Sequence, residues 1–241
     1  MGFFMSDIVT QEEPGPARGD VWRGVRSALP LMASFVPFAL VLGAQASQKG
    51  FSHLEVPLLT GINFGGGSEF AAVGLWTSPP HILLIVAMTF LVNCRHIMMG
   101  AALAPYLAHL KKREVLPALY LMCDEAWALG IADARKHGRL NLRSYMGAAL
   151  GLYLTWITFT LLGSFIGPVL GDVSVYGFDM AFPAVFLVLL SGMWQGWRAA
   201  RPWLVSLIVA AVTHLLVPGA WYVAAGALTG VFAAYVMAEE A

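Results

Sequence analysis

Long runs without an acidic or basic residue dominate the chain. Several of these runs reach the roughly 20 apolar residues that a helix needs to cross a bilayer. The last run, at 36 residues, is long enough for two crossings with a turn near Pro218. The pattern predicts an all-α, polytopic integral membrane protein with seven or eight transmembrane segments, some of them broken or re-entrant. The runs are 27–48, 56–68, 70–94, 96–110, 115–123, 144–171, 180–197 and 203–238.

The composition agrees with this pattern. The hydrophobic fraction is 59%, whereas a soluble domain is usually about 45–50% apolar. The formal net charge is zero, so the chain has no excess of positive charge with which to bind nucleic acid. Cys94 and Cys123 both lie inside apolar runs, where we expect free thiols.

Two regions differ in character along the chain. The first 20 residues are polar and rich in Pro and Gly, so we expect 1–26 to be a flexible cytoplasmic tail. Residues 27–238 are then a single transmembrane transport domain. The motif Gly-Phe-(Ser/Asp) occurs at 50–52 and again at 177–179. This repetition suggests two structurally related halves, as in many transporters.

Basic residues between the runs predict the topology. With eight crossings, the basic loops at 135–143 and 198–201 agree with a cytoplasmic N-terminus under the positive-inside rule. The basic loop 111–113 disagrees, because eight crossings would place it outside. Either this loop is an exception or one of the second, third and fourth segments is re-entrant, and the sequence leaves both open.

The second segment, at about 55–77, carries the stretch NFGGGSEF. Lipid offers no partner to free backbone groups, so a broken helix is tolerated only where protein or a wet cavity covers it. Gly65, Gly66 and Gly67 favour such a break, and the N–H groups that follow it could bind a carboxylate together with the Ser68 hydroxyl. The alternative is that the glycines, beginning with the pair Gly61 and Gly65, only permit close helix packing.

Four ionisable residues fall within apolar segments: Glu69, Arg95, Asp124 and Glu125. Each ionised residue at the bilayer centre costs roughly 2.5–3.5 kcal/mol on insertion scales. One base cannot neutralise three acids, so the remainder requires protons, hydrogen bonds or water. Such groups are candidates for function, and the alternative is a buried ion pair that fixes helix packing.

Spacing predicts which of these side chains face one another. Asn93 and His96 are three residues apart and share a helix face, so Arg95 is expected to point elsewhere. Asp124 and Glu125 are roughly 100° apart on a helix, so only one of them is expected to face a common cavity.

The sequence predicts neither a metal site nor a cofactor. No close pair of histidines or cysteines has the spacing of metal ligands, and the nucleotide-binding pattern Gly-x4-Gly-Lys-Ser/Thr does not occur.

One enzymatic reading remains, an intramembrane serine hydrolase that pairs Ser68 with His96. Glu69 is an awkward neighbour for an oxyanion site, and such an enzyme has no need of a buried Arg95. We therefore expect a protein that is not an enzyme.

Seven short motifs keep their order over about residues 35–235. They are Pro37-Phe38-Ala39 with Gly43, Gly66 to Ala72, Leu91 to His96, Ala104 to Leu107, Asp124-Glu125, Gly177-Phe178-Asp179 and Phe182-Pro183-Ala184. With these motifs the sequence resembles the AzlC family of bacterial inner-membrane permeases. The resemblance implies export of branched-chain amino acids together with a small multi-span partner of the AzlD type. Glu69 stands where the family commonly has Gln, so the resemblance fixes neither the substrate nor proton coupling.

We therefore expect a permease in the bacterial inner membrane that exports branched-chain or other small neutral amino acids, driven by an ion or proton gradient. A passive channel for small polar solutes is the rival. A zwitterionic substrate needs donors for its carboxylate, acceptors for its ammonium and an apolar pocket for its side chain. The predicted binding residues are Asn63, Gly65, Gly66, Gly67, Ser68, Glu69, Asn93, Arg95, His96, Asp124 and Glu125, with Phe64, Phe70, Trp127 and Asp179 as secondary candidates.

Overall fold

The computed structural model describes residues 17–170, 187, 191, 194, 196–217 and 221–238. Every element in this part of the chain is an α-helix, so the all-α prediction is confirmed there. The chain divides into two compact units, 1–179 and 180–241, and each is described by itself. Asp179, the second Gly-Phe-Asp motif and most of the predicted segment 180–197 lie outside the described residues.

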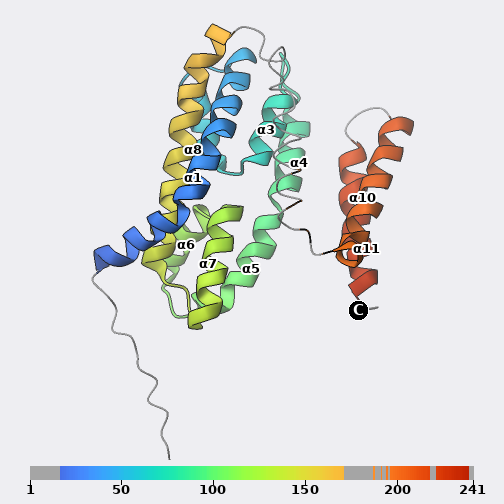
Figure 1. The fold of residues 1–241 in the computed structure, drawn as a ribbon. Helices are drawn as coiled ribbons and strands as arrows, with labels where there is room; N and C mark the ends of the chain where they lie inside the picture. The colour runs from blue at the N-terminus through green and yellow to red at the C-terminus, as the bar shows by residue number, and fades with distance from the viewer. Residues whose placement is uncertain are drawn as a thin grey trace, which may run out of the picture. The chain divides into compact units, whose positions relative to one another are not determined.

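The described part of the first unit, residues 17–170, contains eight helices, whose arrangement is shown in Figure 1. Three stretches are long and apolar enough to cross a membrane: Gly19–Gln48, Ile82–Leu107 and Leu142–Val169. The middle stretch combines two helices that are separated only by Cys94. The helices are α1 (Ala17–Gln48), α2 (Glu55–Asn63), α3 (Gly67–Gly74), α4 (Ile82–Asn93), α5 (Arg95–Leu107), α6 (Lys112–Tyr120), α7 (Asp124–His137) and α8 (Leu142–Leu170).

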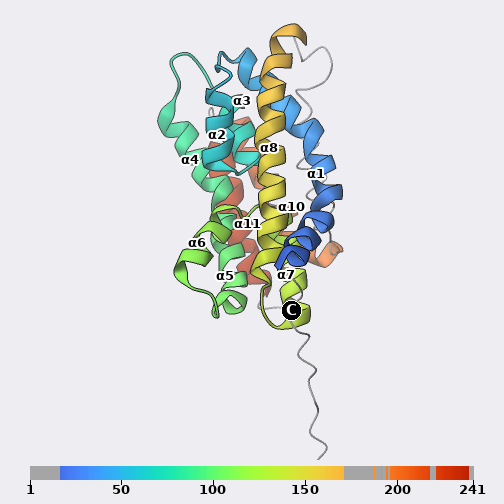
Figure 2. The same ribbon diagram turned by 90° about the vertical axis from the view of Figure 1, so that its left-hand side faces the viewer.

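Helices α1 and α8 lie side by side and run in the same direction (Figures 1 and 2). Glycines four residues apart on α8 allow the two backbones to touch. A side chain at Gly147 would collide with the Val21 carbonyl, and one at Gly163 with the Leu40 carbonyl. This closely packed pair is the frame against which the shorter helices lie.

Helices α2 and α3 form a hairpin that enters from the end where α1 finishes. At its mouth the rings of Phe51 and Trp76 are 4.5 Å apart, so the chain enters and leaves at the same place. Halfway down, the Thr60 and Thr160 hydroxyls are 3.1 Å apart, which holds α2 against α8. The predicted second segment is therefore re-entrant.

Helices α6 and α7 form a second hairpin, which enters from the opposite end. The Leu140 N–H donates to the Tyr106 carbonyl at 3.2 Å, which joins the residues before α6 to those after α7. The Tyr145 hydroxyl on α8 donates to the Ala118 carbonyl of α6 at 3.1 Å. The predicted fourth segment is re-entrant as well.

A glutamate caps the entry of each hairpin. The Ser52 N–H donates to the Glu55 carboxylate at 2.7 Å, and the Ser52 hydroxyl accepts from the Glu55 N–H at 3.2 Å. At the other hairpin the Lys111 N–H donates to Glu114 at 2.9 Å. Such pairs satisfy the free N–H groups of a helix start, which fixes where each hairpin begins.

The second hairpin explains the basic loop that disagreed with eight simple crossings. Because α6 and α7 return to the end from which they started, Lys111–Arg113 lies on the same side of the protein as 135–143. A span followed by a hairpin thus occurs twice, in opposite orientations: α1 with α2–α3, and α4–α5 with α6–α7. This is the arrangement of an inverted repeat.

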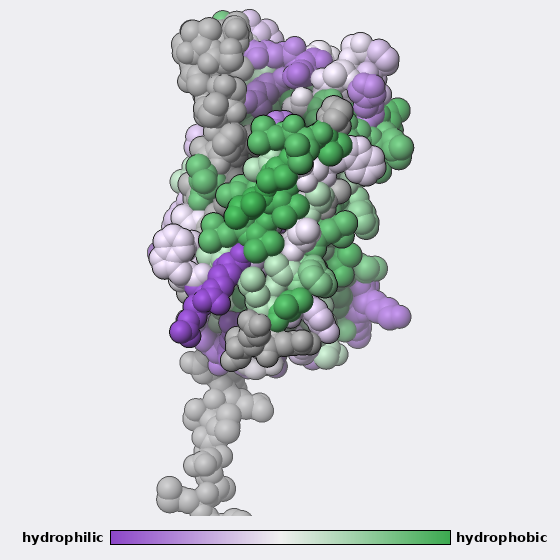
Figure 3. Space-filling view, turned by 90° about the vertical axis from the view of Figure 1, so that its right-hand side faces the viewer, coloured by the Kyte–Doolittle hydropathy of each residue, from purple (hydrophilic) through white to green (hydrophobic). Residues whose placement is uncertain are grey.

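The second unit contains α10 (Trp197–Leu216) and α11 (Trp221–Ala238). The two helices pack through small residues, and the Ser206 hydroxyl donates to the Gly226 carbonyl at 2.7 Å. Large apolar side chains such as Leu215 and Phe232 are exposed, and apolar side chains gather on the surface in Figure 3. The last apolar run therefore forms two helices, as its length predicts.

Candidate functional site

The predicted break in the second segment is present. Helix α2 ends at Asn63, and α3 begins at Gly67. Between them Phe64 has φ 40° and Gly66 has φ 56°. Positive φ is readily adopted by glycine but is uncommon for phenylalanine, so the surrounding contacts must hold this turn in place.

Side chains replace the backbone hydrogen bond that the break removes. In a continuous helix the Gly65 N–H would donate to the Gly61 carbonyl. Here the Gly65 N–H donates to Glu69 Oε1 at 2.9 Å. The Gly61 carbonyl accepts from the hydroxyls of Tyr120 and Tyr153, at 2.5 and 2.9 Å. These bonds meet the requirement that backbone groups at membrane depth be satisfied within the protein.

Glu69 is completely buried, and N–H groups surround its carboxylate. Oε2 accepts from the Trp156 indole N–H at 2.7 Å, while Oε1 accepts from Gly65. Both donors are neutral, and Trp156 lies near the middle of the candidate span Leu142–Val169. A carboxyl group therefore sits at membrane depth and is held by hydrogen bonds rather than by an ion pair.

An amide chain joins the break to the end of α4. Asn63 Nδ2 donates to the Ser68 hydroxyl at 2.7 Å, and Asn93 Nδ2 donates to Asn63 Oδ1 at 3.0 Å. The contact is tight, because a Cβ at Gly65 would lie 2.6 Å from Asn93 Oδ1. Glycine at position 65 therefore leaves room for the side chains of Ser68 and Asn93.

Arg95 links the tips of the two hairpins. Its Nη2 donates to the Gly65 carbonyl at 3.1 Å, and its Nη1 lies 3.1 Å from Asp124 Oδ2 at the start of α7. Both side chains are about a quarter exposed. The only intramembrane cation among the four predicted groups therefore bridges one broken segment to the other.

Two buried polar atoms at this junction have no hydrogen-bond partner within the described part of the chain. They are Asn93 Oδ1, an acceptor, and Arg95 Nε, a donor. Buried polar atoms are nearly always paired, so each such exception needs an explanation. The pair lies near the middle of the candidate span Ile82–Leu107, at the point where the hairpin tips meet.

The structure brings together most of the predicted site residues and corrects one expected orientation. Asn63, Ser68, Glu69 and Asp124 all lie at the hairpin tips, with Asn93 and Arg95 beside them. Arg95 was expected to point away from Asn93, and this is wrong, because both side chains contact the residues 63–65. The helical turn tightens at Cys94, because the Ile97 N–H donates to the Cys94 carbonyl three residues back at 3.0 Å, so the ideal α-helical spacing does not apply there.

Other predicted residues lie nearby with different contacts. His96 Nδ1 is 3.0 Å from the Asn93 carbonyl, whereas the Ser68 hydroxyl accepts from Asn63. The Ser–His pair that a hydrolase needs is therefore not formed. The Trp127 indole N–H donates to the Met99 carbonyl at 3.1 Å.

The two predicted phenylalanines are buried against aromatic residues of α8. The Phe64 ring packs edge-on against Tyr153, with centroids 4.9 Å apart, and the Phe70 ring packs against Trp156, with centroids 6.5 Å apart. Of the neighbouring acids, Asp124 rather than Glu125 forms the ion pair with Arg95.

Sequence reasoning missed the aromatic residues that complete the break, namely Tyr120, Tyr153 and Trp156. A signal was available, because Tyr153 and Trp156 are three residues apart on a long apolar run and so share a helix face. Buried tyrosine and tryptophan usually seek a hydrogen-bond partner for their polar end. The sequence does not reveal that the partners would be a broken helix and its own glutamate.

In this chain two re-entrant hairpins meet at membrane depth through broken, polar tips. Broken helices that meet in this way between inverted repeats are typical of secondary transporters, which bind their solutes there. The family described as "AzlC protein" matches residues 30–170. The chain belongs to this family, and it is a membrane transport protein.

Named relatives agree with this assignment. The chain is 30% identical over 210 residues to an "Uncharacterized membrane protein" of Archaeoglobus fulgidus, which covers 86% of this chain and 91% of the relative. It is 25% identical to the "Inner membrane protein YgaZ" of Escherichia coli, over 64% of each chain. It is 24% identical to the "Branched-chain amino acid transport protein AzlC" of Bacillus subtilis, over 74% of this chain and 71% of the relative. No solved structure matches the chain.

Proposed function

We propose that this protein is a carrier that exports branched-chain or other small neutral amino acids across a bacterial inner membrane. The name of the Bacillus subtilis relative supports the substrate class. A small multi-span partner of the AzlD type would act with it. The proposal rests on Asn93 Oδ1 and Arg95 Nε, two buried polar atoms without a hydrogen-bond partner among the described residues.

An amino acid complements this pair. Its carboxylate accepts hydrogen bonds and its ammonium donates them, so one substrate can satisfy both Arg95 Nε and Asn93 Oδ1. The two atoms belong to residues two positions apart, one at the end of α4 and one at the start of α5. A group carrying only a positive or only a negative charge would leave one of the two atoms unpaired.

Both atoms are buried, so a substrate reaches them only when the hairpin tips separate. Breaking the contact between Arg95 and Asp124 frees both charged groups, which are already partly exposed. Arg95 with the Gly65 N–H then binds the carboxylate, and Asn93 with Asp124 or Glu69 binds the ammonium. Phe64, Phe70 and Trp127 offer apolar surface for the substrate side chain.

Glu69 gives the carrier a site for a coupling proton. Its carboxyl group is buried among neutral donors, and an isolated charge there is costly. Separation of the tips would expose it to water, where it loses a proton, and closure would favour its protonated form. Proton movement is thereby linked to the same motion that admits the substrate.

Counterflow of labelled L-valine in vesicles tests the proposal. Purified protein is reconstituted with its small partner, the vesicles are loaded with unlabelled valine, and uptake of label is followed. A carrier accumulates the label transiently, whereas an open channel does not. Asp124→Asn should slow exchange about tenfold or more, since it removes a charged partner at the tips.

Arg113→Gln is the matched control, because Arg113 is an exposed basic residue at the end of the first unit, outside the tips. Its exchange should equal that of the unaltered protein. If valine, leucine and isoleucine all fail to exchange with the partner present, the substrate assignment is wrong. Label that equilibrates without accumulating would instead favour the channel.

A further inference from the structure

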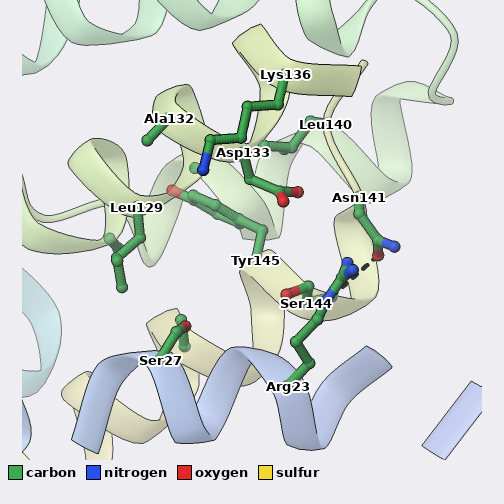
Figure 4. Close-up of a pocket in the computed structure, with 13 residues that line it drawn as sticks. Arg23, Ser27, Leu129, Ala132, Asp133, Lys136, Leu140, Asn141, Ser144 and Tyr145 are labelled. Atoms are coloured by element: carbon green, nitrogen blue, oxygen red, sulfur yellow. Dashed lines mark hydrogen bonds between the residues drawn. The ribbon is translucent and has the colours of Figure 1, made fainter. Parts of the chain in front are cut away.

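A cavity with charged side chains in its lining lies between α1, α7 and α8, away from the hairpin tips. Its volume is about 240 Å³, and Figure 4 shows its lining. α1 contributes Arg23 and Ser27, the last turns of α7 contribute Asp133 and Lys136, and the start of α8 contributes Ser144 and Tyr145. The cavity is at the end of the unit where the basic loops gather.

The charges around the cavity are of both signs. Arg23 and Lys136 are cations, and Asp133 is the acid between them in Figure 4. Arg23 has only a loose contact with Asp20, at 3.6 Å, and Asp133 lies 3.4 Å from His137 Nδ1. Within the described ranges Lys136 takes part in no ion pair. Both cations are therefore available to a ligand.

Apolar surface adjoins these charges. Ala126, Leu129 and Ala148 also line the cavity. On α1 the neighbouring Trp22 is 58% exposed, and exposed tryptophan beside a membrane span is typical of the level at which lipid headgroups lie. The cavity therefore offers both charged groups and apolar surface, as a site for a lipid requires.

We propose that this cavity binds one aminophospholipid by its phosphoethanolamine headgroup. Arg23 and Lys136 bind the phosphate, Asp133 accepts from the primary ammonium, and the acyl chains follow the apolar wall into the bilayer. Basic pockets between membrane helices bind phosphate-bearing headgroups in this way. Asp133 adds selectivity, because an anionic lipid without an ammonium group would leave its carboxylate facing a phosphate.

Native mass spectrometry of the whole protein tests this proposal. Delipidated protein is offered phosphatidylethanolamine, phosphatidylglycerol and phosphatidylcholine with identical acyl chains. One phosphatidylethanolamine should be retained about fivefold better than either competitor. Equal retention of the three lipids, or preference for phosphatidylglycerol, would overturn the proposal without any variant being needed.

Variants then test recognition of the phosphate and of the ammonium separately. Lys136→Gln should weaken the binding of phosphatidylethanolamine and of phosphatidylglycerol alike, whereas Asp133→Asn should weaken only the binding of phosphatidylethanolamine. Arg113→Gln removes a basic residue outside the cavity and should change neither. If it lowers retention as much as Lys136→Gln does, the lipids respond to general surface charge and the cavity is not the site.

Soluble probes distinguish a lipid site from a phosphate site. Phosphoethanolamine in excess should displace the lipid more effectively than inorganic phosphate at the same concentration. If inorganic phosphate displaces it equally well, the site recognises phosphate alone and the role given to Asp133 is refuted. Retained lipid is measured directly, so these outcomes do not depend on whether the protein transports amino acids.

Discussion

Glu69 is the residue on which the break in the second segment depends. Its two oxygens accept from Gly65 and Trp156, so one side chain caps its own helix and ties it to α8. An uncharged residue without acceptors would leave both N–H groups buried and unpaired.

Glu69→Leu should therefore destabilise the protein by about 1–3 kcal/mol for each N–H group left unpaired. Glu69→Gln keeps one acceptor and should cost less, while removing the carboxyl group that we propose exchanges a proton. Thermal unfolding in detergent measures the first effect. The second effect is measured as valine transport with and without a pH gradient. If a pH gradient still drives valine transport by the Glu69→Gln variant, Glu69 does not couple transport to protons.

Glycine is needed at position 65 because the structure leaves no room for a side chain there, and not because the backbone must be flexible. A Cβ at this position would collide with Ser68 Oγ and lie 2.6 Å from Asn93 Oδ1, so Gly65→Ala must displace both side chains and disturb their hydrogen bonds with Asn63. We expect a loss of about 1–3 kcal/mol in the free energy of unfolding, as for other overpacked sites. Gly74→Ala is the control, because a Cβ there meets nothing within 4 Å. Equal unfolding temperatures for the two variants would refute the tight contact.

At the scale of elements, the two opposed hairpins are the main finding. Each begins with a glutamate cap, reaches the middle of the neighbouring spans and returns to its starting end. The hairpins meet through Arg95 and Asp124 and through Tyr120 and Gly61. The two tips are therefore in direct contact, which the proposed alternating access requires.

The hairpins make a prediction about sidedness. Cysteines introduced at Lys112 and Arg139, after replacement of the two native cysteines, should react with an impermeant reagent from the same side of the membrane. A cysteine at Thr77, beside the mouth of the first hairpin, should react from the opposite side. Labelling of Lys112→Cys and Arg139→Cys from different sides would show that α6 and α7 cross the membrane.

Part of this arrangement could be predicted from the sequence. Gly65–Gly67 predicted the break, and the basic residues at 111–113 suggested that a segment was re-entrant. The sequence did not predict that two hairpins would enter from opposite ends. Counting basic residues indicates on which side of the membrane a loop lies, but not the path of the helices that lead to it. Nor did it predict that Glu69 and Trp156, 87 residues apart, would meet, since that contact depends on the depth of the hairpin.

At the scale of the whole molecule, the proposed function requires the tips to open and hold an amino acid. The structure pairs Arg95 with Asp124 and leaves Arg95 Nε and Asn93 Oδ1 without partners among the described residues. In the proposed carrier the hairpins would separate at this contact, one from each side of the membrane. The carrier would then expose a single central site alternately to the two sides.

Binding of labelled L-valine to the purified protein with its partner tests this claim most directly. Arg95→Lys keeps the positive charge beside Asp124 but removes the Nε donor, so it should weaken binding about tenfold or more, as loss of a hydrogen bond to a charged group does. Valinol, which lacks the carboxylate, and isovalerate, which lacks the ammonium, should compete poorly. Saturable valine binding that Arg95→Lys leaves unchanged, or that either analogue displaces as well as valine does, would contradict the account.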